Sequence, residues 1–475
     1  MKVTKYPLRL HASPKAVITH FLFLPGINRI KNVVKRIRDL SEDEVALYLE
    51  QVMKNFAGRH RNIEKTFLNN YSRIRDQHAK SLEDFSDKKK LLLGAFFTKE
   101  YSFQAAALFN PSIVPHPDQT DLKPGEQRFV MSLRATGEGH ISSIIFQTGI
   151  IHKNHIKLDK DPGYFSSLIR RADMVYTKDF ISKRATTFPS FNPEVLHILP
   201  DFFTYTEAHV IFKSASPHPQ AHLHSIEIIE NILDTNYGLE NSARLPVNEK
   251  IVFPNAKAEK AGIEDARFVL FKDGDETMYY GTYTAYDGRN IKTQLIETKD
   301  FNEFRIRTLY GTAISNKGMA LFPEKINGKY VMLSRQGGEK IYIMFSDDLY
   351  VWTDFQVLME PYYTWELLQL GNCGSPLKTD KGWLVLTHGV GAMRTYAISA
   401  ILLDLHDPSK IIGRLSKPLI EAGEGDREGY VPNVVYTCGC MLHENLLIMP
   451  YAVSDSATAF ATIKLDELLN EMISK

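Results

Sequence analysis

The sequence predicts a mainly β fold, and among β folds it favours a propeller over a sandwich by a small margin. From Gly262 to the C-terminus, short runs with strand character alternate with turn pairs such as Asp273-Gly274 and Asn327-Gly328, which is typical of successive hairpins. The segment ETKDFNEF from Glu297 is echoed by FSDDLYVW from Phe345. Repeated strand pairs with similar turns indicate blades around an axis, although the irregular period keeps a sandwich open.

The first hundred residues differ in character and predict a helical module. Ser41-x-x-Glu44 is a capping box, the pairing that satisfies the first N–H groups of a helix, and an apolar stripe follows it. Two more helices are expected over about 60–78 and 81–98. The sequence thus predicts an N-terminal helical module over 1–104 and a β domain over 105–475.

Within the β domain, residues 151–245 interrupt the strand pattern. Helical pieces are expected at Tyr164–Ala172 and Ala221–Leu233, so this stretch is predicted to be a partly helical insertion. A short amphipathic helix is expected near the C-terminus, over Leu465–Ser474.

Composition narrows the function classes. The 475 residues carry a net charge of +1, which gives no overall attraction to nucleic acid or to an acidic membrane. No stretch approaches the ~20 apolar residues that a membrane span needs. The three cysteines, Cys373, Cys438 and Cys440, are too few for a disulfide framework, and Cys438-x-Cys440 lacks the partners of a zinc site. We expect a soluble, cytoplasmic protein without a bound metal.

The segment Gly262–Asn290 holds the clearest candidate for chemistry. Phe268–Phe271 and Met278–Ala285 have strand character and flank a turn-rich stretch, which predicts a hairpin. Glu264-Asp265 and Arg267 stand at its mouth. An acid beside an arginine at a sheet edge can act as a general acid. A surface ion pair explains the same residues, and from this stretch alone the ion pair is favoured.

Polar side chains also end several other predicted strands. Each one alone is most simply a solvated charge, whereas all of them together would converge on one rim of a propeller. Cations there would suit an anion, since guanidinium forks match phosphate geometry. The sequence contains neither a nucleophile elbow nor a nucleotide phosphate loop. The residues are Arg134, Lys317, Arg335, His388 and Asp455.

Several longer motifs make the chain similar to a known family. They include FNPSIV, GIEDARFV, GTYTAYDG, KGMALFPEKINGKYVMLSR, GWLVLTHGV and GYVPNVVYTCG. In order and approximate spacing they resemble glycoside hydrolase family 130, whose members are five-bladed β-propellers that act on β-mannosides by phosphorolysis or hydrolysis. The resemblance runs from about residue 105 to the C-terminus and leaves out the helical module and most of 151–245. It implies an all-β, five-bladed propeller.

The resemblance also implies roles for individual residues. The family's catalytic acid is the aspartate of a Glu-Asp-Pro-Arg motif, and Asp265 takes that place here, with Ala266 replacing the proline. Sugar-binding positions of the first and last blades are matched as well. Rim aromatics could stack on a sugar ring, although strand tyrosines and tryptophans more often pack in a core. The predicted substrate-binding set is Asn110, Arg134, Arg267, Tyr283 and Asp455.

Phosphorylases of the family hold phosphate with basic residues from three motifs. Lys317 and Arg335 match two of them, His388 matches a nearby histidine, and Gln369 replaces the third cation. Losing one charged hydrogen bond lowers affinity roughly ten- to hundredfold. Because no new acid replaces these cations, water lacks an evident base, and phosphorolysis is favoured over hydrolysis. The bases left open for a hydrolase are Glu339 and Glu366.

The resemblance therefore implies an inverting enzyme that cleaves a β-mannoside with inorganic phosphate to α-mannose 1-phosphate, with Asp265 as the proton donor. No cofactor is expected beyond phosphate as co-substrate. An inverting β-mannosidase that uses water is the alternative, and a carbohydrate-binding propeller without turnover is a third hypothesis. The expected partners are a mannose-containing oligosaccharide and phosphate. For the helical module two roles are open, shaping the acceptor subsite or forming a homo-oligomer interface.

Overall fold

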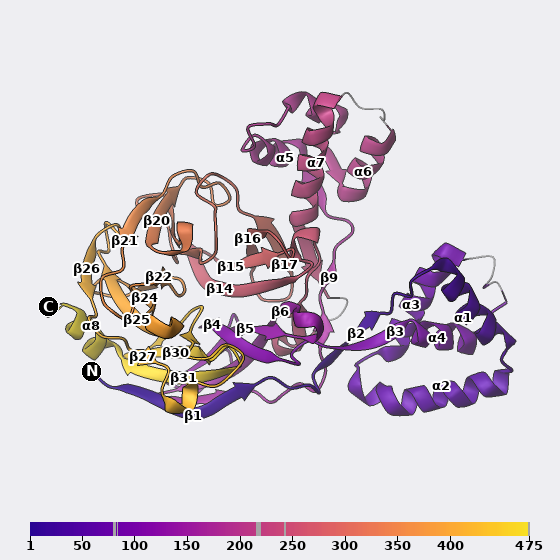
Figure 1. Cartoon of the computed structure of the whole chain (residues 1–475), viewed down its shortest axis with the longest axis horizontal. Coiled ribbons are helices and arrows are strands. Elements are labelled where there is room, and N and C mark those ends of the chain that lie inside the picture. The colour runs from indigo at the N-terminus through magenta and orange to yellow at the C-terminus, as the bar shows by residue number, and fades with distance from the viewer. Residues whose placement is uncertain (79–81, 83, 215–219, 242–243, 474–475) are drawn as a thin grey trace.

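Antiparallel sheets form most of this computed structural model, which describes residues 1–78, 82, 84–214, 220–241 and 244–473. Figure 1 shows the sheets side by side around a common centre, in the order of the chain. The strands fall into five consecutive groups, and the first two groups join in one twelve-stranded sheet where Gly262 pairs with Ser142. The groups are β4 (Ala107–Pro115), β5 (Glu126–Thr136), β6 (Ser142–His152) and β7 (His155–Leu158); β14 (Gly262–Asp273), β15 (Glu276–Tyr286), β16 (Ile291–Thr298) and β17 (Phe304–Thr308); β18 (Ala320–Leu321), β19 (Tyr330–Ser334), β20 (Ile341–Ser346) and β21 (Gln356–Met359); β22 (Gln369–Asn372), β23 (Leu377–Lys378), β24 (Trp383–Val390), β25 (Tyr396–Leu403), β26 (Ile411–Arg414) and β27 (Ile420–Glu421); and β28 (Val435–Tyr436), β29 (Met441–His443), β30 (Leu446–Val453) and β31 (Ala457–Lys464).

Apolar side chains fill the spaces between neighbouring groups. Every residue of β24 is buried, because the sheet is covered on both faces. Trp352 and Trp383 are among the largest fully buried side chains, and each lies in a cluster shared by two groups of strands. This packing holds the inner strands in fixed positions, so polar residues at their ends have defined places.

The first strand of the chain corrects the predicted helical module. β1 (Val3–His11) pairs antiparallel with β31 and forms the outer edge of the last sheet, as Figure 1 shows. Residues 3–11 of the predicted 1–104 module therefore belong to the last sheet and are not helical. Every second residue from Tyr6 to Leu10 is apolar, and these side chains pack against the core beneath, which is the period-two pattern of a half-buried strand.

The helical module follows this strand, with four α-helices among its described residues; of the helix expected over 81–98, residues 81 and 83 lie outside the described residues. The four helices are α1 (Ile27–Asp39), α2 (Glu42–Phe56), α3 (Ile63–His78) and α4 (Asp87–Phe96). The predicted capping box is present: Ser41 Oγ accepts from the Glu44 backbone, and the Glu44 carboxylate accepts from the Ser41 N–H at 2.8 Å. A two-stranded ribbon of β2 (Val17–Phe21) and β3 (Thr98–Ser102) joins the module to the sheets.

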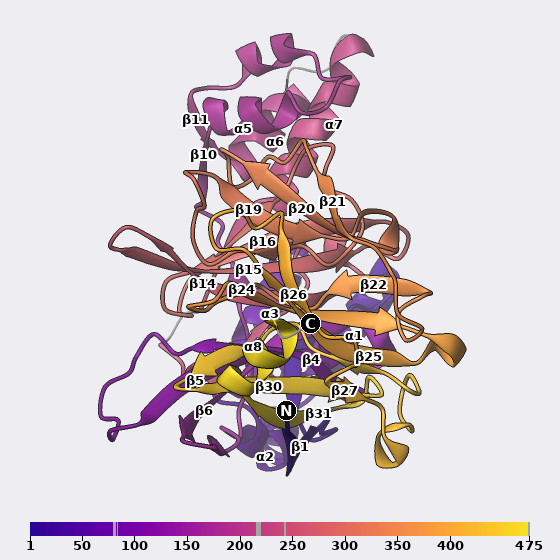
Figure 2. The same ribbon diagram turned by 90° about the vertical axis from the view of Figure 1, so that its left-hand side faces the viewer.

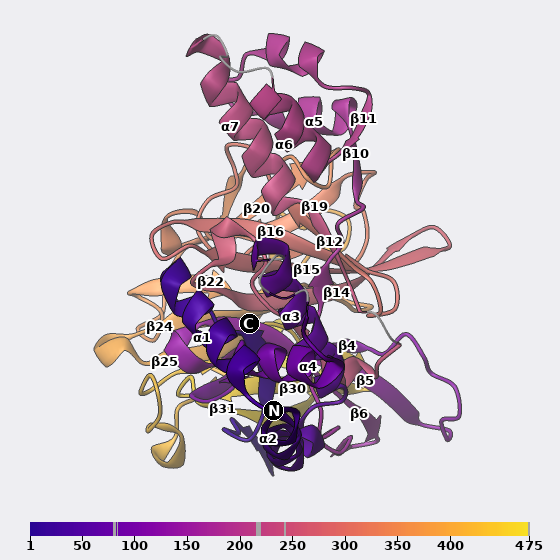
Figure 3. The ribbon, with the colours of Figure 1, turned by 90° about the vertical axis from the view of Figure 1, so that its right-hand side faces the viewer.

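The insertion forms a second helical lobe, which projects from the sheets in Figures 2 and 3. Its helices are α5 (Lys178–Ala185), α6 (Tyr205–Ser214) and α7 (Gln220–Thr235), beside β10 (Val175–Thr177) and β11 (Phe202–Thr204). The helix expected at Ala221–Leu233 is confirmed within α7. The one expected at Tyr164–Ala172 is wrong, because β8 (Ser166–Ser167) and β9 (Ile169–Arg170) there pair with the distant strands β13 (Lys250–Val252) and β12 (Tyr237–Glu240).

The predicted hairpin and the C-terminal helix are both present. β14 and β15 pair from Gly262↔Tyr286 to Asp273↔Glu276. The helix is α8 (Leu465–Ile473). Within the described part of the chain, no helix combines the length and the apolar character that crossing a membrane requires.

Candidate active site

Two bulged inner strands bring an amide and a carboxylate together. The register of β4 with β5 shifts between Phe109 and Ser112, and that of β14 with β15 shifts between Glu264 and Arg267. A bulge turns a side chain away from the regular alternation. Asn110 and Asp265 occupy the two bulges with positive φ values of 50° and 57°, a conformation that Asn and Asp tolerate better than most residues. The Asn110 amide donates to Asp265 Oδ1 at 2.7 Å.

The Asp265 carboxyl lies in a field of positive charge. Arg134 on β5 approaches it, with Nη1 3.4 Å from Oδ1. Burial alone would raise the pKa of this carboxyl, but Arg134, Arg267, the Asn110 amide and Lys317 together outweigh it and lower the pKa to about 2. The carboxyl is therefore ionised at neutral pH in the ligand-free protein.

Glu264 connects the two sides of the cluster, a role that its sequence position did not reveal. Its Oε1 accepts from Arg134 Nη2 at 2.9 Å, and its Oε2 accepts from Lys317 Nζ at 2.6 Å. The Glu264 side chain is mostly buried, whereas Lys317 is 35% exposed. One carboxylate thus fixes a cation on the predicted sugar side and a cation on the predicted phosphate side.

Arg267 supports the site from behind instead of making the predicted sugar contact. It is buried, and its Nε, Nη1 and Nη2 donate to the Cys373 carbonyl at 2.7 Å, the Asp265 carbonyl at 2.8 Å and the Tyr436 hydroxyl at 2.8 Å. All three nitrogens therefore have protein acceptors. The donation to the Asp265 carbonyl holds the bulge that orients the acid.

Tyr283 lies outside the cluster, contrary to the prediction that it contacts substrate. Its side chain is buried among core residues, and its hydroxyl donates to Glu259 at 2.5 Å. The side chain has no exposed face that a sugar could stack on. In this respect the more common role of strand tyrosines, core packing, holds.

Arg335 and His388, here called the phosphate-side pair, meet where the third and fourth groups of strands face each other. Arg335 Nη1 lies 2.9 Å from His388 Nε2. Burial first, and then the nearby Arg335 and Arg267, lower the pKa of His388 well below its ordinary value, so the imidazole is neutral and Nε2 accepts from the arginine. The ring stacks on Tyr396 and meets Tyr436 edge-on.

Two glycines let the backbone approach the phosphate-side pair. A Cβ on Gly371 would lie 2.4 Å from the ring of His388 and 2.8 Å from Arg335 Cδ, closer than atoms can pack. Gly318, with φ of 91°, would place a Cβ 3.5 Å from Arg335 Cβ. Because Lys317 directly precedes Gly318, the backbone of both predicted phosphate-binding cations converges here. Gln369, which replaces the third cation, lies 3.3 Å from His388 Nε2.

Asp455 lies at the turn between β30 and β31, close enough to Asp265 for their charges to interact. Burial and the Asp265 charge raise the pKa of Asp455 to about 6, against the opposing effect of Arg134 and Arg394. Two carboxyl groups with opposite pKa shifts thus share one cluster. The structure brings together Asn110, Arg134, Asp265, Lys317, Arg335, His388 and Asp455, on strand ends of all five groups.

The two bases left open for a hydrolase are not placed alike. Glu366 is completely buried, accepts from the Tyr362 and Tyr363 backbone N–H groups at 2.9 Å, and pairs with Arg414. That carboxylate is committed to the protein. Glu339 is exposed on the turn after Arg335.

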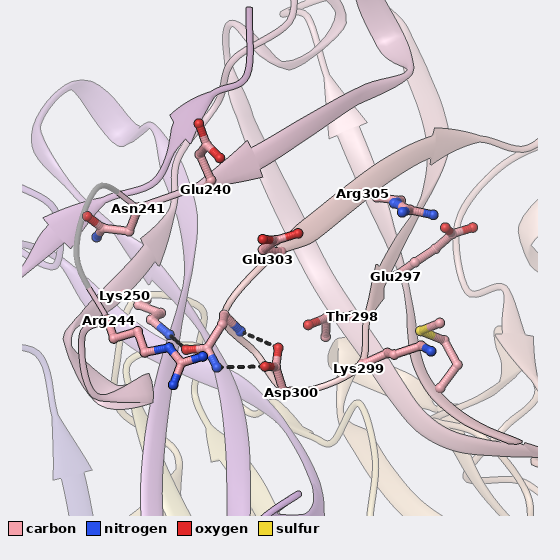
Figure 4. A pocket seen from close by; sticks show the side chains of 12 residues that line it. Glu240, Asn241, Arg244, Lys250, Glu297, Thr298, Lys299, Asp300, Glu303 and Arg305 are labelled. Atoms are coloured by element: carbon pink, nitrogen blue, oxygen red, sulfur yellow. Dashed lines mark hydrogen bonds between the residues drawn. The ribbon is translucent and has the colours of Figure 1, made fainter. Parts of the chain in front are cut away.

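A cavity of about 490 Å³ lies elsewhere, beside β12, β13, β16 and β17 (Figure 4). It contains none of the predicted site residues. Four basic and four acidic side chains line it, so it offers no net field for an anion. Asn302 accepts from Lys250 Nζ and donates to Asp300 Oδ2, each at 2.7 Å, so these lining side chains are hydrogen-bonded to one another.

Comparison with known proteins assigns the family. A family model described as beta-1,4-mannooligosaccharide phosphorylase, of glycoside hydrolase family 130, matches residues 158–474. The chain belongs to glycoside hydrolase family 130. The family predicted from the motifs is confirmed, although the match covers residues 158–474 with the insertion included, instead of beginning at about residue 105 and leaving most of 151–245 out. The first strand group and the helical module precede the matched segment of this family 130 protein.

The chain is also similar to relatives that are named as phosphorylases of mannosides. The chain is 35% identical over 229 residues to a 1,2-beta-oligomannan phosphorylase of Thermoanaerobacter sp. (strain X514), covering 47% of this chain and 75% of the relative. It is 32% identical over 230 residues to a beta-1,2-mannobiose phosphorylase of Listeria innocua, covering 46% and 63%. A solved structure of a beta-1,2-mannobiose phosphorylase from Listeria innocua with beta-1,2-mannobiose gives a TM-score of 0.48 at 23% identity, over 78% of this chain and 93% of that one.

Proposed function

We propose that this family 130 protein is an inverting β-mannoside phosphorylase. The observation that carries the proposal is the convergence of Asp265 with Lys317 and the phosphate-side pair, while the buried alternative base, Glu366, is paired with Arg414. An inverting hydrolase needs a second free carboxylate to activate water, and of the two bases considered only the exposed Glu339 is left for that role. A phosphorylase needs no such carboxylate, because phosphate is the nucleophile. The named activities of the relatives support the same reading.

We further infer that the five strand groups are the blades of a β-propeller, with β1 as the outer strand of the last blade. Each group contributes at least one polar residue to the cluster. Convergence of strand ends from every blade on one face is what radial repetition produces.

In the proposed mechanism, the substrate's terminal mannose lies against Asn110, Arg134 and Asp455. Phosphate lies against Lys317 and Arg335, where paired cations suit its oxygens. A phosphate oxygen attacks the anomeric carbon from the face opposite the leaving group, which inverts the configuration and yields α-mannose 1-phosphate. Holding both reactants in line supplies a large part of the rate.

Proton delivery by Asp265 requires a change in its electrostatic surroundings. The carboxyl is ionised in the free protein, since its pKa is about 2. Bound phosphate brings negative charge to the cations that hold this pKa down, and a like charge nearby raises the pKa of a carboxyl. We propose that phosphate binding thereby enables Asp265 to carry the proton, which reaches the leaving oxygen directly or through a mannose hydroxyl.

The test is product analysis on β-1,2-, β-1,3- and β-1,4-mannobiose with and without phosphate. For at least one linkage, α-mannose 1-phosphate is expected to be released only when phosphate is present, as measured by phosphorus NMR. Equal release of free mannose without phosphate would instead establish a mannosidase, and no turnover of any substrate would favour a binding protein.

Asp265→Asn provides the second test. Turnover is expected to fall about 10²- to 10⁴-fold, the usual contribution of a general acid, while calorimetry still detects mannobiose binding. Full activity in this variant would remove Asp265 from the mechanism.

A further inference from the structure

An ion-pair junction links the first strand of the chain to the loop that precedes β28. Lys5 and Arg9 of β1 approach opposite oxygens of the Asp426 carboxylate, with Nζ–Oδ2 at 3.1 Å and Nη2–Oδ1 at 2.6 Å. The Asp426 side chain is only 7% exposed. Burial would raise the pKa of this carboxyl, but Lys5 and Arg9 lower it overall. The junction is therefore charged at neutral pH.

The backbone around Asp426 connects this ion-pair junction to the turn that holds Asp455 in the candidate active site. The Asp426 carbonyl accepts from the Ser454 hydroxyl at 2.6 Å, and Ser454 is completely buried. The Val431 N–H donates to the Ser454 carbonyl at 3.0 Å, and the Ser454 N–H donates to the Val434 carbonyl at 2.7 Å. Gly429 approaches so closely that a Cβ there would lie 2.5 Å from the Ser454 carbonyl oxygen. The loop thus contacts Ser454 through three hydrogen bonds.

Ser454 and Asp455 form the turn that this loop contacts, and both have left-handed backbone conformations, with φ of 47° and 48°. Met393 and Arg394, between β24 and β25, have the same conformation, with φ of 56° and 55°, so this backbone conformation is not particular to the Ser454 turn. The position of Ser454 is instead fixed by its contacts. The three hydrogen bonds to Ser454 are such contacts.

We infer that Asp426 is a positioning residue for mannoside binding. Through Ser454 it holds the turn that presents Asp455, and Lys5 and Arg9 keep Asp426 in place. The inference rests on the proposed sugar-binding role of Asp455. Lys5 and Arg9 lie outside the family-matched segment 158–474, so the N-terminal strand supplies a determinant of the site that this segment does not contain.

The test compares Asp426→Asn with a matched control, Glu249→Gln. The Glu249 carboxylate is also buried, at 4% exposed, and is also paired with a cation from the N-terminal part of the chain, Arg61 at 2.5 Å. With β-1,2-mannobiose, Asp426→Asn is expected to raise KM for the mannoside about two- to fivefold, the effect of loosening a partly exposed ion-pair network. KM for phosphate is expected to stay the same, because Lys317 and Arg335 lie on other strand groups. Glu249→Gln is expected to lower Tm without changing either KM.

Two further variants separate positioning from general stability. Lys5→Ala/Arg9→Ala is expected to raise the mannoside KM as Asp426→Asn does, and combining the changes should add little, because all three residues act as one unit. Asp426→Glu keeps the charge and is expected to restore most of the affinity. If Asp426→Asn does not fold, the lysine and arginine variant still tests the inference.

Two results would overturn the inference: equal rises in both KM values, or a lower Tm with an unchanged mannoside KM. Asp455→Asn is measured alongside. If it raises the mannoside KM and Asp426→Asn does not, the inference alone fails. If Asp455→Asn has no effect either, the proposed sugar site itself is misplaced.

Discussion

Replacing Lys317 by glutamine isolates one half of the phosphate site. The Lys317 Nζ lies 2.6 Å from Glu264 Oε2, and the side chain is 35% exposed. A hydrogen bond between charged groups contributes about 1.5–3 kcal/mol. Because this ammonium is already shared with Glu264 and partly hydrated, we expect the lower end, about 1.5–2 kcal/mol. That corresponds to a roughly 10- to 30-fold rise in KM for phosphate.

The assay varies phosphate at saturating mannobiose and follows α-mannose 1-phosphate by initial rates. Lys325→Gln is the matched control, since Lys325, between β18 and β19, is 32% exposed and pairs with Asp273 of β14 at 2.7 Å, away from the cluster. It should leave KM for phosphate unchanged. If Lys317→Gln also leaves it unchanged, Lys317 serves only as the partner of Glu264, and phosphate binds elsewhere.

Three other variants test the remaining parts of the site. Asp455 has a folded-state pKa of about 6, above its unfolded value, so its ionisation at higher pH destabilises the fold. Asp455→Asn should therefore raise the unfolding free energy at pH 7.5 by at most about 3 kcal/mol, and should not raise it at pH 4. An equal gain at both pH values in thermal melts would contradict this. Gly371→Ala should displace the phosphate-side pair and raise KM for phosphate. The control Gly58→Ala, where a Cβ meets nothing within 4 Å, should leave KM for phosphate unchanged. Equal KM values in the two variants would contradict the close approach of Gly371 to the phosphate-side pair. Glu366→Gln should lower the unfolding free energy by about 1–3 kcal/mol, because the pair with Arg414 is weakened, and phosphorolysis should be retained. If the variant instead loses a phosphate-independent release of mannose, Glu366 is a hydrolytic base.

Local signals in the sequence predicted the elements whose cause is local. The capping box at Ser41 and the hairpin of β14 and β15 depend on residues a few positions apart, and both were found where the pattern placed them. The strand at residues 3–11 was missed although its alternation was visible, because its partner β31 lies more than four hundred residues away. Pairing with distant strands also explains why residues 164–172 are not helical, because β8 pairs with β13 and β9 pairs with β12.

In the candidate site, too, some residues could be predicted from the sequence and others could not. Residue type and strand position were enough to collect Asp265 and the cations around it, since strand ends converge on one face. They were not enough to separate Arg267 from Arg134, because both are arginines near the acid, and only the backbone acceptors of Arg267 reveal its supporting position. The sequence does not indicate that Glu264 bridges Arg134 and Lys317, because the number of residues between two positions does not give their distance in the fold.

The pairing of β1 with β31 joins two strands that are more than four hundred residues apart in the sequence. During synthesis β1 is therefore made long before its partner strand exists. A variant that lacks β1 would leave the outer edge of β31 open to other chains. We expect such a variant to aggregate through this open edge.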